Sequence, residues 1–135
     1  MGRSKWPTMR WKAVTIPSHR AGLVAEQRAA LFLEKKGVQL LERNFRCRWG
    51  EIDIIGQSHL TLIFVEVKFR SRARWGTPLA QVTNQKKIRL VRTAMTYLQQ
   101  SQTDHFDQIR FDVLACAEKT HWIQGAFSAD DLILD

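Results

Sequence analysis

Apolar residues change their spacing along this chain, and the changes predict an alternation of helices and strands. Over residues 20–36 they recur at helical spacing. The expected apolar stripe consists of Leu23, Ala25, Ala29, Ala30, Leu31, Phe32 and Leu33. Gly37 follows where a helix commonly ends. A second helix should begin at Thr83 or Asn84 and reach about Gln100. Its expected core stripe is Ile88, Val91, Ala94 or Met95, and Leu98.

Short apolar runs predict the strands. Three of them, over residues 39–46, 48–56 and 60–69, follow one another with at most three residues between them, which favours an antiparallel meander. Residues 108–117 form a further apolar run, and 121–127 a weaker hairpin partner. A helix before a returning strand favours parallel pairing. The sequence therefore predicts an α/β fold in which a mixed central sheet is flanked by helices.

Composition places this chain among single-domain proteins. It has 135 residues, the size of one ordinary domain. Residues 1–18 form a basic arm, 19–128 the expected domain and 129–135 an acidic tail. No apolar run approaches the roughly 20 residues that span a bilayer, and the arm lacks the apolar centre of a secretory signal. We therefore expect a cytoplasmic protein without a membrane partner. The two cysteines, Cys47 and Cys116, are expected to be reduced.

Positive charge is concentrated in one part of the chain. The net charge is +8, and residues 67–103 hold eight Lys or Arg and no acid. From residue 104 to the end there are seven acids and two bases. Such a basic segment indicates a polyanionic partner, nucleic acid above all. A merely solvated basic surface is the alternative.

Two strand segments carry acids where an ordinary core strand would not. Strand side chains alternate between faces, so Glu51 and Asp53 should share one face and Ile52 and Ile54 the other. Glu66 and Lys68 share a face of the next strand. If these strands pair, Asp53, Glu66 and Lys68 converge. Such a group is costly to bury unless it binds something, and a hard divalent cation with a phosphate suits it. The alternative is an internal ion-pair cluster in which Lys68 and Arg70 neutralise the acids.

Further charged residues occur at spacings that bear on the same site. Arg70, Arg72 and Arg74 recur every second residue, a pattern that suits a track for phosphates. Lys86 and Arg89 share a face of the second helix. Arg110 and Asp112 flank Phe111, and could pair with each other or support Lys68 from behind. Glu26, among small and apolar residues of the first helix, either turns toward the sheet or stays partly exposed near the helix start.

The whole series of residues resembles a known family. It comprises Gly22-x-x-Ala25-Glu26-x-x-Ala29, Arg43-Asn44, Gly50-Glu51-Ile52-Asp53-Ile54-Ile55, Phe64-Val65-Glu66-Val67-Lys68-x-Arg70, Lys86-x-x-Arg89 and Arg110-Phe111-Asp112-Val113. It is similar to the YraN family of predicted bacterial endonucleases, and its Asp-x12-Glu-x-Lys spacing resembles the PD-(D/E)XK nuclease superfamily. The resemblance covers roughly residues 20–116. Ile52 stands where the superfamily's name has proline.

The resemblance implies a fold and a chemistry. The fold would be restriction-endonuclease-like, with an αβββαβ core. Asp53, Glu66 and the carbonyl of Val67 would hold Mg²⁺ or Mn²⁺, Lys68 would position or activate a water, and Glu26 would complete the site. Glu51 would add a metal contact or pair with Lys68 or an arginine.

The activity so implied is hydrolysis of DNA, branched or single-stranded, with Arg70, Arg72, Arg74, Lys86 and Arg89 on the nucleic acid. A homodimer could let two such sites address two strands. A nucleic-acid-binding module without turnover is the alternative, and a protein-interaction scaffold is a third class.

Overall fold

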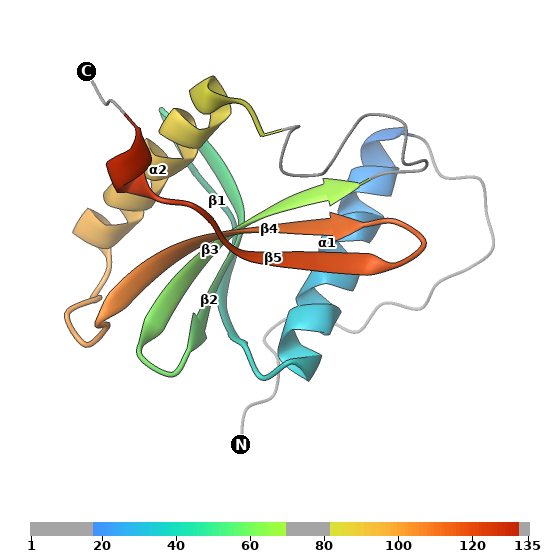
Figure 1. Cartoon of the computed structure of the whole chain (residues 1–135), viewed down its shortest axis with the longest axis horizontal. Coiled ribbons are helices and arrows are strands. Elements are labelled where there is room, and N and C mark those ends of the chain that lie inside the picture. Colours follow the sequence, from blue (N-terminus) through green and yellow to red (C-terminus); the bar gives the residue numbers. More distant parts are fainter. Residues whose placement is uncertain (1–17, 70–81, 133–135) are drawn as a thin grey trace.

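The computed structural model describes residues 18–69 and 82–132, and these form two helices, five strands and a short 3₁₀ turn. In chain order they are α1 (Ser18–Lys35), β1 (Gln39–Cys47), β2 (Gly50–Ser58), β3 (Thr61–Phe69), α2 (Asn84–Gln100), β4 (Gln108–Cys116), β5 (Thr120–Phe127) and η2 (Ala129–Asp131). The predicted order of elements is confirmed (Figure 1). The predicted basic arm, apart from its last residue Ser18, and residues 70–81 after β3 lie outside the described residues.

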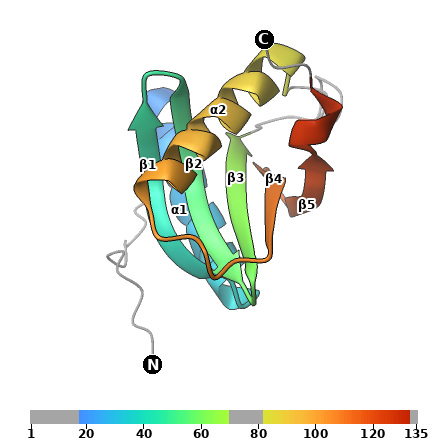
Figure 2. The ribbon, with the colours of Figure 1, turned by 90° about the vertical axis from the view of Figure 1, so that its left-hand side faces the viewer.

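The strands form one mixed sheet in the order β1-β2-β3-β4-β5. The first three strands are an antiparallel meander. β4 pairs parallel to β3 after the crossover that contains α2, and β5 pairs antiparallel to β4. Figure 2 shows α1 and α2 on opposite faces of this sheet, and each helix covers its own apolar cluster. A mixed sheet flanked by two helices is consistent with a restriction-endonuclease-like core. Neither helix in the described part of the chain is both long and apolar enough to cross a membrane.

The face of α1 that meets the sheet is narrower than predicted. Ala25, Ala29, Ala30 and Leu33 are buried, but Leu23 and Leu31 are exposed, and their predicted place in the core is wrong. The small alanine side chains let the helix axis approach the sheet closely. Of the leucines in this helix, only Leu33 lies on the alanine stripe and is buried between the helix and the sheet. The helix ends as predicted: Gly37 has a φ of 91°, and the Val38 N–H donates to the Leu33 carbonyl.

The core face of α2 is also rotated from the predicted one. Thr83 caps the helix by accepting from the Lys86 N–H, as expected. The buried residues are Leu90, Val91, Thr93, Ala94 and Tyr97, whereas Met95 is exposed and Ile88 and Leu98 are half-buried. Thr93 can face the sheet because its hydroxyl donates to the Arg89 carbonyl and leaves no unpaired polar group there.

The β1 and β2 strands twist sharply at one point. Ile52 packs with the α2 cluster and Ile54 with the α1 cluster, so the prediction that they share a face is wrong. Asn44, in β1, has a left-handed φ of 55°, and it lies opposite Asp53 because its neighbours pair with Ile52 and Ile54. This distortion turns the outer half of the hairpin onto α2. It breaks the strict alternation from which the faces were predicted.

Candidate active site

A fork in the sheet creates the candidate site. β2 and β3 are paired only up to Ile54 and Val65, so the two strands separate at Asp53 and Glu66. The N-terminal halves of α1 and α2 flank this opening. The result is a pocket of about 340 Å³. It is lined by Gly22, Ala25 and Glu26 of α1, by Gly50, Glu51, Asp53, Glu66, Val67, Lys68 and Phe69 of the sheet, and by Lys86, Arg89 and Leu90 of α2.

Two carboxyl groups meet at the base of the fork. Asp53 Oδ2 accepts a hydrogen bond from the Val67 N–H at 2.8 Å. Val67 lies beyond the last paired residues of β2 and β3, and the Asp53 side chain provides a partner for its N–H. The Asp53 carboxyl is also in hydrogen-bond contact with the Glu66 carboxyl, and Glu66 is only 4% exposed. Burial, followed by the charge of Glu66 and the hydrogen bond to it, raises the pKa of Asp53 to about 9. The pair therefore retains a proton at neutral pH.

Two lysines complete the centre. Lys68 Nζ lies 3.4 Å from Glu66 Oε2, and Lys86 Nζ lies 2.6 Å from the same oxygen. Burial acts to lower the pKa of Lys86, but its hydrogen bond and charge interaction with Glu66 outweigh burial and raise it. The predicted convergence of Asp53, Glu66 and Lys68 is confirmed. Pairing of Lys86 with Glu66 was not predicted, because the two residues come from separate elements and no spacing in the sequence relates them.

Glu26 lines the pocket, so the prediction that its side chain turns toward the sheet is confirmed over the alternative of an exposed acid near the helix start. Its side chain is 16% exposed, and Arg43 Nη2 lies 4.0 Å from its Oε1. That oxygen is buried without a hydrogen-bond partner among the described residues. Burial raises the pKa of Glu26, although the charge of Arg43 opposes this. Arg43 is itself fixed to α1, since its Nη1 donates to Gln27 Oε1 at 2.8 Å.

The remaining predicted residues separate into two groups. Glu51 lines the pocket and accepts a hydrogen bond from Arg46 Nε, so it pairs with an arginine rather than with Lys68. Arg110 and Asp112 lie elsewhere: Arg110 donates twice to Asp112 at 2.9 Å. Asp112, 1% exposed, also accepts from Trp122 Nε1 and the Gly125 N–H. Arg110 and Asp112 thus fasten β4 to β5, pairing with each other, the first of their two predicted roles.

The predicted phosphate contacts are only partly described. Lys86 and Arg89 line the pocket together. Arg70, Arg72 and Arg74 lie outside the described residues. The alternative prediction of an ion-pair cluster is met in part. Within the described residues, Lys68 and Lys86 both pair with Glu66. Arg70, the second predicted cation, lies outside the described residues.

The donor atoms of the pocket fit a hard divalent cation. Asp53 holds a proton beside Glu66 that a cation could replace, and Glu26 Oε1 is a buried oxygen without a hydrogen-bond partner among the described residues. Within residues 18–69 and 82–132, however, no three His, Cys, Asp or Glu side chains are grouped to hold one ion. A cation would thus take two side-chain ligands, Asp53 and Glu66, and complete its shell with the Val67 carbonyl and water. Few carboxylates and several waters are typical of Mg²⁺.

Comparison with known proteins places the chain in one family. Residues 25–116 match the model described as "Uncharacterised protein family UPF0102". The UPF0102 protein of Syntrophus aciditrophicus (strain SB) is 43% identical over 100 residues, which are 74% of this chain and 78% of that protein. That of Janthinobacterium sp. (strain Marseille) is 41% identical over 110 residues, 81% of this chain and 88% of the relative. The matched segment contains the main charged residues of the pocket, Glu26, Asp53, Glu66, Lys68 and Lys86. The chain belongs to the UPF0102 family.

Proposed function

We propose that this protein is a nuclease of the PD-(D/E)XK type that hydrolyses phosphodiester bonds of DNA with Mg²⁺ or Mn²⁺. The observation that carries the proposal is the contact of the Asp53 and Glu66 carboxyls at the base of an open pocket, with Lys68 beside them. A buried carboxyl such as Asp53, whose pKa is raised by burial and by a neighbouring charge and which lines an open pocket, is typical of functional sites. A bound divalent cation would polarise the scissile phosphate and acidify a water.

The residues of the pocket would divide the work. Asp53 is held by the Val67 N–H, so its carboxyl group is fixed in direction before any ligand arrives. Glu66 is held by Lys68 and Lys86. The ammonium of Lys68, 3.4 Å from Glu66 Oε2, would orient the attacking water or neutralise charge on the phosphate. Glu26, across the pocket on α1, would accept a proton or hydrogen bond from that water.

The charge around the pocket suits a polyanion. Lys86 and Arg89 of α2 stand at its wall, and the chain carries a net charge of +8. Such residues position a phosphodiester backbone without reading its sequence. DNA, either branched or single-stranded, is therefore the proposed substrate.

One observation favours a second candidate, a nucleic-acid-binding module without turnover. The Lys86 ammonium lies 2.6 Å from Glu66 Oε2, so a cation already occupies one side of the carboxylate pair. A site that keeps this lysine in place would bind phosphate without hydrolysing it. Salt-sensitive DNA binding that persists in Asp53→Asn, together with no cleavage, would support this candidate.

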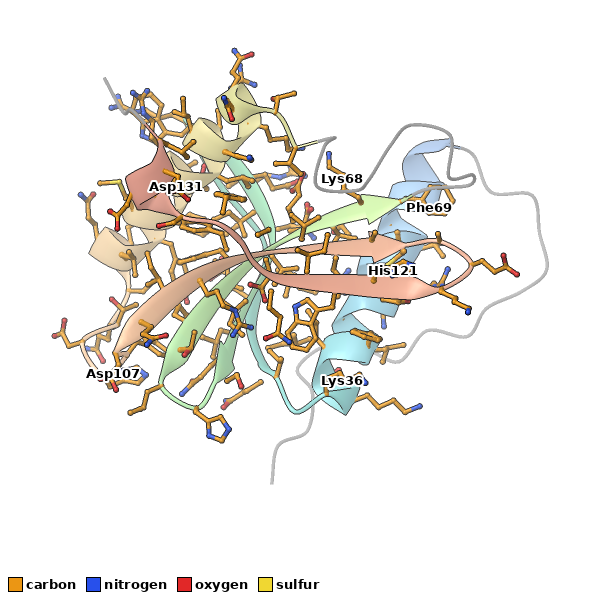
Figure 3. The ribbon with its side chains drawn as sticks, viewed as in Figure 1. Lys36, Lys68, Phe69, Asp107, His121 and Asp131 are labelled. Atoms are coloured by element: carbon orange, nitrogen blue, oxygen red, sulfur yellow. The ribbon has the colours of Figure 1, made fainter. Side chains whose placement is uncertain are left out.

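The test is cleavage of labelled linear, flapped and four-way DNA with Mg²⁺, Mn²⁺ or chelator. We expect metal-dependent products that fall by at least about a hundredfold in Asp53→Asn and Lys68→Met, the usual effect of removing a group that stabilises the transition state. Lys36→Met is the matched control, because Lys36 is exposed at the far end of α1, away from Lys68 (Figure 3). Absence of products with both metals, or equal activity in all variants, would refute the nuclease.

A further inference from the structure

The turn between β1 and β2 carries an arrangement of cations and an aromatic ring outside the pocket. Arg48 Cζ lies over the Trp49 ring, 4.5 Å from its centroid, and Arg92 Cζ of α2 lies over the same ring at 4.7 Å. Two like charges are thus gathered on one indole. Each cation–ring contact contributes only about 0.5–1 kcal/mol at an exposed site. An anion bound beside this ring would be attracted by both guanidinium groups.

The turn is held firmly in this position. The Trp49 N–H donates to Cys47 Sγ at 3.4 Å. Gly50 has a φ of 146°, and a Cβ there would meet Thr93 Oγ1 at 3.6 Å and Arg89 Cβ at 3.9 Å, so the turn lies directly against α2. A rigid arrangement of cations binds with a smaller entropic cost than mobile surface side chains do.

The same helix connects the turn with the pocket. Lys86, Arg89 and Arg92 follow one another at three-residue spacing on α2, so they lie on one face, about 4.5 Å apart along the axis. Lys86 and Arg89 line the pocket, and Arg92 reaches Trp49. Within the part of the chain that the structure describes, Arg48 and Arg89 form no ion pair with a carboxylate. Both are exposed, and their charges remain available to a ligand.

We infer that Arg48, Trp49, Arg89 and Arg92, here called the α2 ridge, bind the sugar-phosphate backbone of a single nucleic-acid strand that enters the pocket. The inference rests on the proposed function and names its substrate class. A pocket of about 340 Å³ is at the lower end of the size of small-ligand sites, so it would take one phosphodiester linkage of that strand at a time. The ridge would bind the part of that strand next to the scissile bond. Trp49 would act as a positioning residue that fixes the two guanidinium groups.

The test is the salt dependence of binding, measured in chelator so that no cleavage is needed. The probe is a fluorescent single-stranded oligonucleotide, and its anisotropy gives Kd over a series of NaCl concentrations. The test variant is Arg48→Gln with Arg92→Gln. The matched control is Lys35→Gln with Lys36→Gln, which removes the same charge from exposed positions at the end of α1.

Loss of two phosphate contacts should reduce the slope of log Kd against log salt by about 1.4, since each contact on a single strand contributes about 0.7. The control should leave the slope unchanged. Arg48→Gln alone, on an exposed turn where unfolding is not at issue, should give about half the change. Trp49→Leu should weaken binding and Trp49→Phe should restore most of it.

Equal slopes for the test variant and its control would overturn the inference. So would a larger change with a duplex probe than with the single strand. These results can be told apart from a failure of the proposed nuclease activity. If the protein binds the single strand as predicted but cleaves no DNA, the α2 ridge stands and the nuclease proposal fails. If it cleaves DNA but the salt slopes do not change, the nuclease proposal stands and the α2 ridge fails.

Discussion

Replacing Asp53 by asparagine should stabilise the ion-free protein at high pH. Asp53 is buried beside Glu66, and its pKa rises from 3.8 to about 9. Between these values the folded protein holds a proton that the unfolded chain has lost. The free energy of unfolding should therefore fall as the pH rises, by about 1.4 kcal/mol per pH unit, because the unfolded state binds one proton fewer. Asparagine keeps an oxygen for the Val67 N–H but does not ionise, and it removes this dependence.

Worked over an accessible range, the effect is large. From pH 5 to pH 8 the stability of Asp53→Asn relative to the original protein should increase by about 4 kcal/mol. Glu26, whose pKa burial also raises, contributes in the same direction to both proteins. The contribution of Asp53 is complete below pH 3.8 and declines through the window up to about pH 9.

Urea unfolding followed by tryptophan fluorescence, at several pH values in chelator, measures the difference. Asp107→Asn is the matched control, because it removes an exposed carboxyl at the other end of the sheet from Lys68 (Figure 3). A flat difference for Asp53→Asn would show that no proton is retained in the pocket, and the reasoning about the carboxyl pair would fail.

Three further outcomes follow from the same contacts. Calorimetric titration with Mn²⁺ at pH 7, in buffers of different ionisation enthalpy, should show release of about one proton, because the cation replaces the proton of the carboxyl pair; no buffer dependence would contradict this. Lys86→Gln should tighten Mn²⁺ binding up to about fivefold, since a half-exposed ion pair with Glu66 contributes up to about 1 kcal/mol; weaker binding would mean that Lys86 assists the cation. Asp112→Asn should lower the free energy of unfolding by about 3 kcal/mol, because it breaks the buried pair with Arg110, and should leave Mn²⁺ affinity unchanged; a loss of affinity would connect that pair to the pocket.

The sequence predicted the elements and the meeting of the carboxyls because both follow from local rules. Short connections after residue 39 required an antiparallel meander, and the crossover helix required β4 to run parallel to β3. Asp53 and Glu66 meet because the hairpin register between β2 and β3 places them opposite each other, just past the last pair, Ile54 and Val65. The resemblance to a nuclease family added the expected role of Glu26.

The rest depended on geometry that alternation and periodicity do not encode. The left-handed Asn44 twists β1 and β2 so that Ile52 and Ile54 face different helices. The rotation of α2 depends on whether Thr93 can satisfy its hydroxyl within the helix. The pairing of Lys86 with Glu66 joins residues from different elements, which no spacing in the sequence reports.

Anomalous scattering from a crystal grown with Mn²⁺ would show directly whether Asp53 and Glu66 hold a divalent cation. We expect one strong peak within bonding distance of the Asp53 and Glu66 carboxylates, with the Lys86 ammonium displaced from Glu66, and no such peak in Asp53→Asn crystals. Well-ordered Mn²⁺ elsewhere, with the carboxyl pair still in mutual contact and Lys86 in place, would contradict this expectation.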